Sequence, residues 1–137
     1  MAAAGYSGTP LAKKLSLKDG MRVWFDAMPD SVRADIDGYG LALDVLDWPA
    51  PGMDAAHIFV TDRNAMEERL AMLRPLIDLA GFVWVSWPKK ASKVPTDITE
   101  DVIRAVTLPT TDWVDVKVCA VDAVWSGLKL VIRKERR

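Results

Sequence analysis

The feature that most constrains the fold is a strand-helix-strand pattern between Ala56 and Lys90. Two apolar runs, Ile58 to Thr61 and Phe82 to Trp87, flank a segment with helical periodicity. Strands that are apolar nearly throughout are typical of parallel sheets buried on both faces, and a helix between two such strands makes a βαβ unit. The sequence therefore predicts the centre of a parallel α/β sheet.

The helix of this unit is predicted from its apolar spacing and its ends. Its apolar residues recur at helical intervals and share one face: Met66, Leu70, Leu73 and Ile77. Asn64, with Glu67 following it, has the pattern of an N-terminal capping box. Pro75 cannot donate a backbone hydrogen bond, so we expect the helix to kink or end there before Gly81 closes the unit.

The rest of the chain supplies further strands and helices around this centre. They are a helix at 11–17, a strand at 21–26, a short helix from 30 to about 36, a strand at 41–46, a helix from 97 to 109, and a hairpin of 113–121 and 128–133. Asp97 with Glu100 predicts the cap of the last helix. Alternation in the hairpin predicts one core face with Val114, Val116, Val118 and Ala120, and another with Leu128, Leu130 and Ile132.

The predicted fold class is a three-layer, Rossmann-like α/β domain with a mostly parallel sheet and a C-terminal antiparallel hairpin. We expect one domain over residues 1–137, with an N-terminal arm and short helix in 1–18 and the α/β core in 19–137. Trp113, Cys119 and Val131 fall opposite the expected core side of the hairpin, and such an edge favours a homodimer.

Composition narrows the function classes. With 50% hydrophobic residues, 27% charged residues and a net charge of −1, the chain is typical of a globular protein, and no global basic field argues for a nucleic-acid partner. The single cysteine, Cys119, leaves no disulfide framework or thiolate metal cluster, and we expect a cytoplasmic location. No apolar run approaches the length of about 20 residues that spans a bilayer, so no membrane association is expected.

Several whole motifs resemble a family of small bacterial proteins known only as a domain of unknown function. They are AGYSGTPLAKKL, VSWPKKAS, TDITEDVIR and VDVKVCAVDAVWSGLKLVIRKE, which contains VDAVWSGLK. The order of elements is similar to a class I methyltransferase core that lacks one strand and one helix of its first half. The resemblance to the family of unknown function implies no activity. The resemblance to the methyltransferase core implies an α/β fold.

A ligand site is expected where the parallel strands end, because open α/β sheets bind ligands at their carboxyl edge. The ligand-binding candidates at this edge are Asp62, Arg63, Ser86, Trp87, Lys89, Lys90, Lys93, Trp125 and Ser126. Their hydroxyls, aromatic face and ammonium groups are suited to bind a phosphate or a carboxylate. The simpler interpretation of the lysine run is a solvated loop that follows a core tryptophan. Ser92 belongs to the same loop.

Other polar residues give weaker signals. The lone histidine, His57, is expected to be structural and has no second ligand for a metal, and Cys119 is expected to be an inert thiol. Asp44, Asp47 and Asp54 are too scattered for a metal site, so we expect them to be solvated. Asp26 and Asp62 could pair across neighbouring strand ends, but a functional pair is the less favoured interpretation.

The loop after the first strand determines which function we expect first. A dinucleotide or S-adenosylmethionine site usually needs glycines there, whereas this chain has Asp26-Ala27-Met28-Pro29. We therefore expect no cofactor, no binding of S-adenosylmethionine tighter than millimolar, and a non-catalytic protein that binds an anionic small molecule, such as phosphate or a nucleotide, or a protein partner. Two alternatives stay open: a minimal methyltransferase-like or nucleotide-using enzyme, and a homo-oligomeric structural protein.

Overall fold

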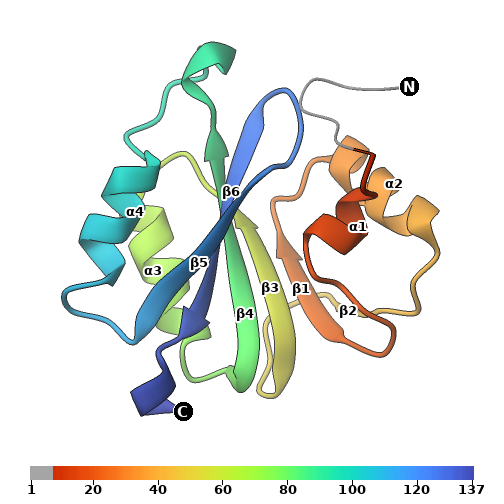
Figure 1. Ribbon diagram of the computed structural model, residues 1–137, viewed down its shortest axis with the longest axis horizontal. Helices are drawn as coiled ribbons and strands as arrows, with labels where there is room; N and C mark the ends of the chain where they lie inside the picture. The colour runs from red at the N-terminus through yellow and green to blue at the C-terminus, as the bar shows by residue number, and fades with distance from the viewer. Residues whose placement is uncertain (1–7) are drawn as a thin grey trace.

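The computed structural model describes residues 8–137, which contain a six-stranded mixed sheet (Figure 1). The strands are β1 (Arg22–Asp26), β2 (Asp44–Leu46), β3 (Met53–Phe59), β4 (Ile77–Pro88), β5 (Trp113–Ala120) and β6 (Trp125–Ile132). The helices are α1 (Leu11–Lys14), α2 (Asp30–Tyr39), α3 (Arg63–Leu73) and α4 (Glu100–Thr107), with short 3₁₀ turns η1 (Lys90–Ser92) and η2 (Lys134–Arg136).

The strand order is β2-β1-β3-β4-β6-β5. Strands β1 to β4 are mutually parallel where they pair, β6 runs antiparallel to β4, and β5 runs antiparallel to β6. The predicted fold class, a Rossmann-like and methyltransferase-like α/β fold with a C-terminal hairpin, is confirmed. The carboxyl ends of β1 to β4 and the β5-β6 turn lie at one edge, which is uppermost in Figure 1.

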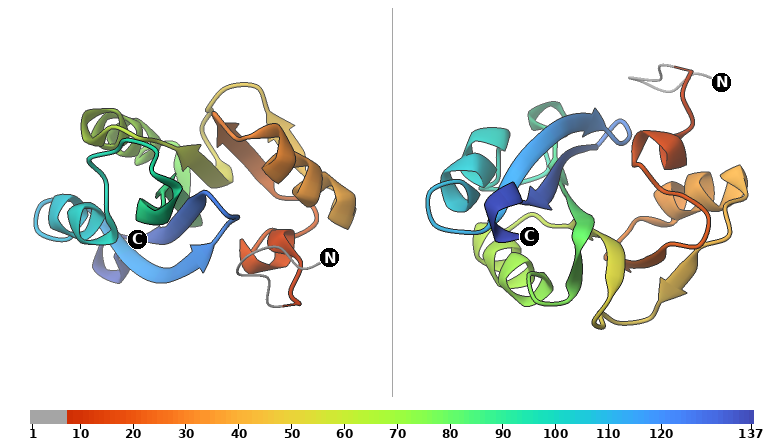
Figure 2. Two further views of the ribbon diagram at one scale, coloured as in Figure 1. Left: turned by 90° about the horizontal axis from the view of Figure 1, so that it is seen from above. Right: turned by 60° about the horizontal axis from the view of Figure 1, so that its bottom comes forward.

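Helices cover both faces of the sheet, with α3 and α4 on one face and α1 and α2 on the other (Figure 2). The α3/α4 face buries alternate residues of the central strands, among them Ile58 and Val85, against Met66 and Ile103. The α1/α2 face buries the intervening residues, and there Trp84 donates its indole N–H to the carbonyl of Leu15 at 2.9 Å. Both faces of β3, and of β4 from Phe82 onward, are therefore largely buried, which explains why these residues are mostly apolar.

The helices α3 and α4 begin at different residues from those predicted. Asp62, not Asn64, caps α3 by accepting a hydrogen bond from the amide of Ala65 at 2.8 Å. Thr99, not Asp97, caps α4. Both caps are short polar side chains with extended backbones, and the sequence offers two such residues within a few positions of each start.

The C-terminal end of the βαβ unit is corrected in a similar way. Met66, Leu70 and Leu73 are buried as predicted, and α3 ends before Pro75. Ile77 belongs to β4 and not to the helix, so β4 begins five residues before the predicted strand. Gly81 lies within β4, where a Cβ atom would stand 2.6 Å from the carbonyl oxygen of Asp54. This close approach of two strands, not a turn, requires glycine.

The hairpin prediction is correct for β6 and wrong for β5. Leu128, Leu130 and Ile132 of β6 are buried. In β5, however, the predicted core residues Val116 and Val118 are 52% and 47% exposed, whereas Trp113 and Cys119 are buried. A register shift of the β-bulge type between Asp115 and Lys117 breaks the alternation on which the prediction was based. The homodimer stays a prediction, but Trp113 and Cys119 are not available to support it.

Other bounds differ by a few residues: α1 ends at Lys14, α2 extends to Tyr39, and β2 is confined to Asp44–Leu46. Among the described residues, no helix has the length and hydropathy needed to cross a membrane. The parts of the predicted arm and of the first family motif that fall in residues 1–7 lie outside the described residues.

Candidate functional site

A topological switch point lies between β1 and β3. The chain passes from β1 to β2 on one side and then returns to β3 on the other side of β1. Ligands of open α/β sheets bind in the crevice outside the carboxyl ends of the strands at such a point. The segments that follow β1, β2 and β3 are therefore the first place to examine for a site.

The loop after β1 turns sharply through Ala27, whose φ is +56°. A residue other than glycine is uncommon in this left-handed region because its Cβ crowds the following carbonyl. Pro29 then serves as the N-cap of α2, with φ −58°, so the helix starts directly after the turn. The backbone thus makes at Ala27 the kind of turn for which cofactor-binding loops usually employ glycine.

An ion pair spans the switch point. The Nε of Arg69 on α3 donates to the carboxylate of Asp26, at the end of β1, at 2.7 Å. The Asp26 side chain is 20% exposed and that of Arg69 is 39% exposed, so both charges reach solvent. Asp62 has a separate task as the cap of α3, and the carboxylates of Asp26 and Asp62 therefore have different partners. Arg69 was not among the residues predicted at this edge.

Two exposed residues follow β2. Asp47 is exposed and makes no hydrogen bond or ion pair within residues 8–137. Trp48 is 72% exposed, more than any other large hydrophobic residue described. Sequence reasoning set Asp47 aside as solvated. Its position about 20 residues after the first strand is the signal that could have found it, since Rossmann-type sites carry an acidic residue at that spacing for ribose hydroxyls.

The predicted residues after β3 are held by their neighbours. Arg63 pairs its Nε with Glu67 at 3.1 Å and donates its amide to Asp97 at 2.7 Å. The Thr96 hydroxyl donates to the carbonyl of Thr61 at 2.7 Å. The loop that precedes α4 is therefore attached to the start of α3, and the structure places Asp62 and Arg63 at the carboxyl edge with their polar atoms already engaged.

The predicted residues Ser86 and Trp87 are buried near the end of β4. Trp87 is 7% exposed and packs in the α3/α4 core. Ser86 is fully buried, and its hydroxyl lies 2.6 Å from Nε2 of His57. His57 stacks on Phe59 with ring centroids 4.4 Å apart. Burial lowers the pKa of His57 to about 3, so its imidazole is neutral at physiological pH.

The remaining predicted residues border the same edge. Lys89 donates its backbone amide to Val124 at 2.7 Å, which brings the end of β4 against the hairpin turn, and Lys90 and Lys93 are exposed beside it. Trp125 is half-buried and meets Phe59 edge-on at 5.1 Å. Ser126, also half-buried, pairs with Trp87 across the β4-β6 ladder.

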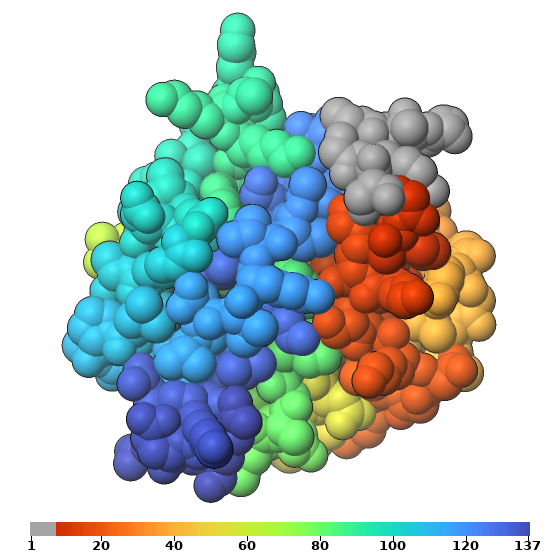
Figure 3. Space-filling model, in the orientation of Figure 1, coloured from red at the N-terminus to blue at the C-terminus, as the bar shows by residue number. Residues whose placement is uncertain are grey.

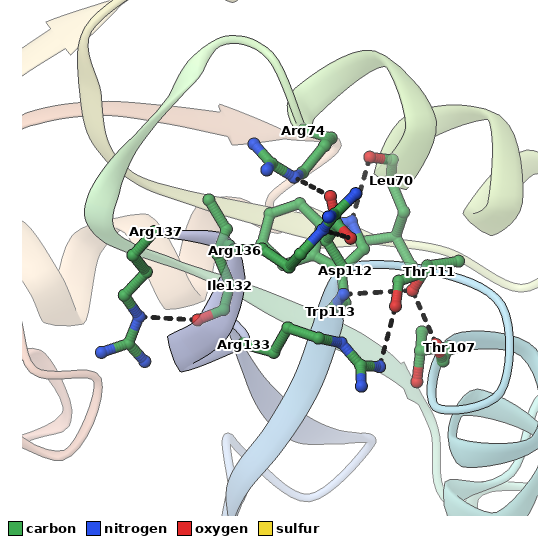
Figure 4. A network of polar contacts seen from close by, with 10 residues as sticks. All are labelled: Leu70, Arg74, Thr107, Thr111, Asp112, Trp113, Ile132, Arg133, Arg136 and Arg137. Carbon is green, nitrogen blue, oxygen red and sulfur yellow. Dashed lines mark hydrogen bonds and ion pairs between the residues drawn. The ribbon is translucent and has the colours of Figure 1, made fainter.

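A second polar network occupies the opposite edge of the sheet (Figure 4). Asp112 accepts hydrogen bonds from Nε of Arg74 at 3.0 Å and from Nε of Arg136 at 3.1 Å. Partial burial opposes ionisation, but these hydrogen bonds hold the pKa of Asp112 below its usual range. Arg133 donates to the carbonyls of Leu108 and Thr111 at 2.9 and 2.8 Å.

This network borders a cleft of about 410 Å³ between α3 and α4. Its charged groups, Glu67, Arg74 and Asp112, are all paired. The network therefore explains how α3, β5 and the C-terminal turn are joined, and it leaves no free acid or base for chemistry. No group of three or more metal-ligating side chains occurs within residues 8–137.

Known proteins resemble this chain in structure but not in sequence. No family model and no curated protein matches it. A SAM-dependent methyltransferase from Aquifex aeolicus matches with a TM-score of 0.61 and 17% identity over 90% of this chain and 88% of that one. Magnesium protoporphyrin IX methyltransferase from Synechocystis, with bound SAM, gives 0.55 and 10% over 90% and 74%. A TehB-like SAM-dependent methyltransferase from Corynebacterium glutamicum gives 0.53 and 9% over 95% and 91%.

These matches correct the functional ranking drawn from the sequence. The leading expectation, a non-catalytic protein that binds an anionic small molecule or a partner, is wrong, because the structural neighbours are SAM-dependent methyltransferases and some hold SAM. They favour the methyltransferase-like alternative. The expectation was based on the absence of glycine after β1, and Ala27 makes a left-handed turn there without glycine.

Proposed function

We propose that this chain is a methyltransferase-like enzyme that binds S-adenosylmethionine at the carboxyl ends of β1, β2 and β3. The observation that supports the proposal most is the match to the Aquifex aeolicus SAM-dependent methyltransferase, which extends over 88% of that protein. The match includes nearly the whole sheet of this chain, because it covers 90% of its residues. Enzymatic activity and the cofactor itself are part of the proposal.

The residues around the switch point fit such a cofactor. Asp47 has a carboxylate without a partner in the described chain, where the ribose hydroxyls of an adenosyl group need an acceptor. Trp48 offers an exposed indole beside it for stacking on adenine. The Asp26-Arg69 pair places one negative and one positive group together, which suits the ammonium and carboxylate of the methionyl part.

The protein contributes binding and orientation. S-adenosylmethionine supplies an electrophilic methyl group on a sulfonium, so transfer needs a nucleophile brought into line with that bond. His57 is not the base, since its imidazole is buried and held by Ser86. In this proposal the methyl acceptor would contact the residues that border the carboxyl edge of the sheet on the β4 side. These are Lys89, Lys90, Lys93, Trp125 and Ser126.

Calorimetric titration with S-adenosylmethionine and S-adenosylhomocysteine tests the proposal. We expect micromolar binding to the wild-type protein. Asp47→Asn should weaken it about 10- to 100-fold, the loss expected for hydrogen bonds to a charged group worth about 1.5–3 kcal/mol. Asp44→Asn is the matched control, because Asp44 is an exposed carboxylate at the start of β2 and, within residues 8–137, its side chain pairs only with Arg22, at 3.7 Å.

Two results of this titration would contradict the proposal. If neither compound binds below millimolar concentration, the glycine-poor loop excludes the cofactor, and the proposal is overturned. If both bind but Asp47→Asn and Asp44→Asn behave alike, the cofactor is bound elsewhere and the assignment to the end of β2 is incorrect.

A further inference from the structure

Lysine and arginine have different roles in this protein. Every ion pair in residues 8–137 uses an arginine, and none uses a lysine. Arginine is suited to paired, directional contacts, whereas lysine is a flexible point charge. The lysine charges of the described chain are therefore left without a neutralising carboxylate in direct contact.

Five of these lysines gather where α1 meets the β5-β6 hairpin, and we name this surface the lysine face: Lys14, Lys18, Lys89, Lys117 and Lys129. Two contacts join the two segments. Nζ of Lys14 donates to the carbonyl of Ala120 at 3.1 Å, and Nζ of Lys129 donates to the hydroxyl of Ser16 at 3.1 Å. In Figure 3 this junction of α1 with the hairpin faces the viewer.

Like charges lie close together on the lysine face, where the Lys129 ammonium also stands 4.5 Å from the centroid of the Phe82 ring. Lys117 and Lys129 are direct partners across the antiparallel ladder, an arrangement that destabilises a sheet when both charges have the same sign. Burial lowers the pKa of Lys129, and the charges of Lys117 and Lys18 lower it further. Lys117 precedes Cys119 by two residues on β5, and Lys14 reaches the carbonyl of Ala120 next to it. Burial raises the pKa of the Cys119 thiol, and the charges of Lys14, Lys117 and Lys89 lower it.

Nearby carboxylates do not neutralise this face by direct contact. Asp19 accepts a hydrogen bond from the amide of Ala42 at 2.7 Å, and Asp122 accepts from the amides of Val124 and Trp125 at 2.8 and 2.7 Å. Like charges placed together at a cost in stability are expected at functional surfaces and not at structural ones. An anion bound over these lysines would relieve the repulsion.

We propose that the lysine face binds the phosphodiester backbone of a single-stranded nucleic acid. The lysine face runs along β5 from Lys117 to the carbonyl of Ala120, to which Lys14 donates. At 3.3 Å per residue this length is about 10 Å. It is longer than a single phosphate group. Lysine is depleted in protein-protein interfaces but is a general contact for phosphate backbones. The net charge of −1, from which we expected no nucleic-acid partner, conceals this local excess.

The test is fluorescence anisotropy of a labelled short single-stranded RNA, and of DNA of the same sequence, over a range of salt concentrations without S-adenosylmethionine. The test is thus independent of the proposed enzymatic function. Each phosphate neutralised on a single strand contributes about −0.7 to the slope of log K against log salt. We expect Lys117→Gln with Lys129→Gln to weaken binding at least tenfold and to flatten the slope by about 1.4.

The matched control is Arg33→Gln with Lys134→Gln, which removes two charges from α2 and η2, elements that contribute no residue to the lysine face, and should leave affinity and slope unchanged. Circular dichroism and melting curves verify folding. In the lysine variant the loss of the Lys129 contacts with Ser16 and the Phe82 ring opposes the gain from removed repulsion, so the melting temperature should change little. Equal loss in both variants, or an unchanged salt slope in the lysine variant, overturns the proposal. Equally tight binding of polyglutamate would also overturn it, in favour of an acidic protein partner.

Discussion

The buried pair of His57 and Ser86 predicts how the stability of this protein depends on pH. Because burial lowers the pKa of His57 from 6.5 to about 3 in the folded protein, the native state keeps this imidazole neutral. The unfolded chain protonates it near pH 6.5. Between these two values the unfolded state binds more protons, so the free energy of unfolding rises with pH. This contribution is therefore fully present above pH 6.5 and is lost as the pH falls towards 3.

The size of the effect follows from the two pKa values. Each pH unit within this window changes the free energy of unfolding by about 1.4 kcal/mol. Lowering the pH from 7.5 to 5 should therefore cost about 2 kcal/mol. Asp112 and Asp115 have pKa values lowered by their arginine partners, and such carboxylates lose their stabilising effect mainly below about pH 4.5. His57 is the only histidine. The change in the free energy of unfolding above pH 5 therefore comes chiefly from this residue.

Urea denaturation at pH 7.5 and pH 5 measures this quantity, with wild type compared with His57→Gln. The amide of glutamine can keep a hydrogen bond to Ser86 but does not titrate. We expect the wild type to lose about 2 kcal/mol between the two pH values and the variant to lose much less, with equal urea dependence in both. Equal losses in the two proteins would refute the argument that burial of His57 sets the pH dependence.

The remaining predictions concern the backbone and the surface. Gly81→Ala should destabilise the protein by about 1–3 kcal/mol in urea denaturation, because its Cβ meets a backbone carbonyl that cannot move aside. Ala27→Val should cost about 1 kcal/mol, since φ is +56° there and a β-branched residue tolerates this region poorly; a neutral result would show that the loop relaxes. Lys89→Glu with Lys90→Glu should change the free energy of unfolding by no more than about 0.5 kcal/mol in urea denaturation, because Lys90 is exposed and Lys89 half-buried; a larger loss would show that these side chains hold the loop after β4. Light scattering should give a homodimer, and a monomer at high concentration would remove that prediction.

The sequence predicts the centre of the sheet because the signals there are strong and local. Most residues of β3, and of β4 from Phe82 onward, are apolar since both faces are covered by helices, and the stripe of Met66, Leu70 and Leu73 identifies the buried side of α3. Caps were less certain, because Asp62 and Asn64 are chemically equivalent candidates. The choice of Asp62 depends on the docking of Asp97 against the amide of Arg63, a contact between distant segments.

The candidate site was less predictable for a related reason. A residue type shows what a side chain can do, but not whether neighbours already use it. Ser86 and Trp87 are the kind of residues that bind ligands, yet the parallel register places Ser86 opposite Phe59 and within reach of His57. Asp47 was set aside because Asp44, Asp47 and Asp54 are too scattered for a metal site, and Trp48 was not among the predicted site residues. The order of strands makes Asp47 and Trp48 adjacent to the end of β1.

The lysine face depends on the register shift in β5. In a regular strand, Trp113 and Cys119 would share one face, since they are separated by an even number of positions. In the structure Trp113 belongs to the α3/α4 core and Cys119 to the α1/α2 core, so the shift between Asp115 and Lys117 reverses the side-chain alternation. Lys117, which alternates in phase with Cys119, is thereby turned to the side of α1 and opposite Lys129. With Trp113 anchored in its core and no bulge, Lys117 would point to the α3/α4 side, and the cluster of lysines would not form.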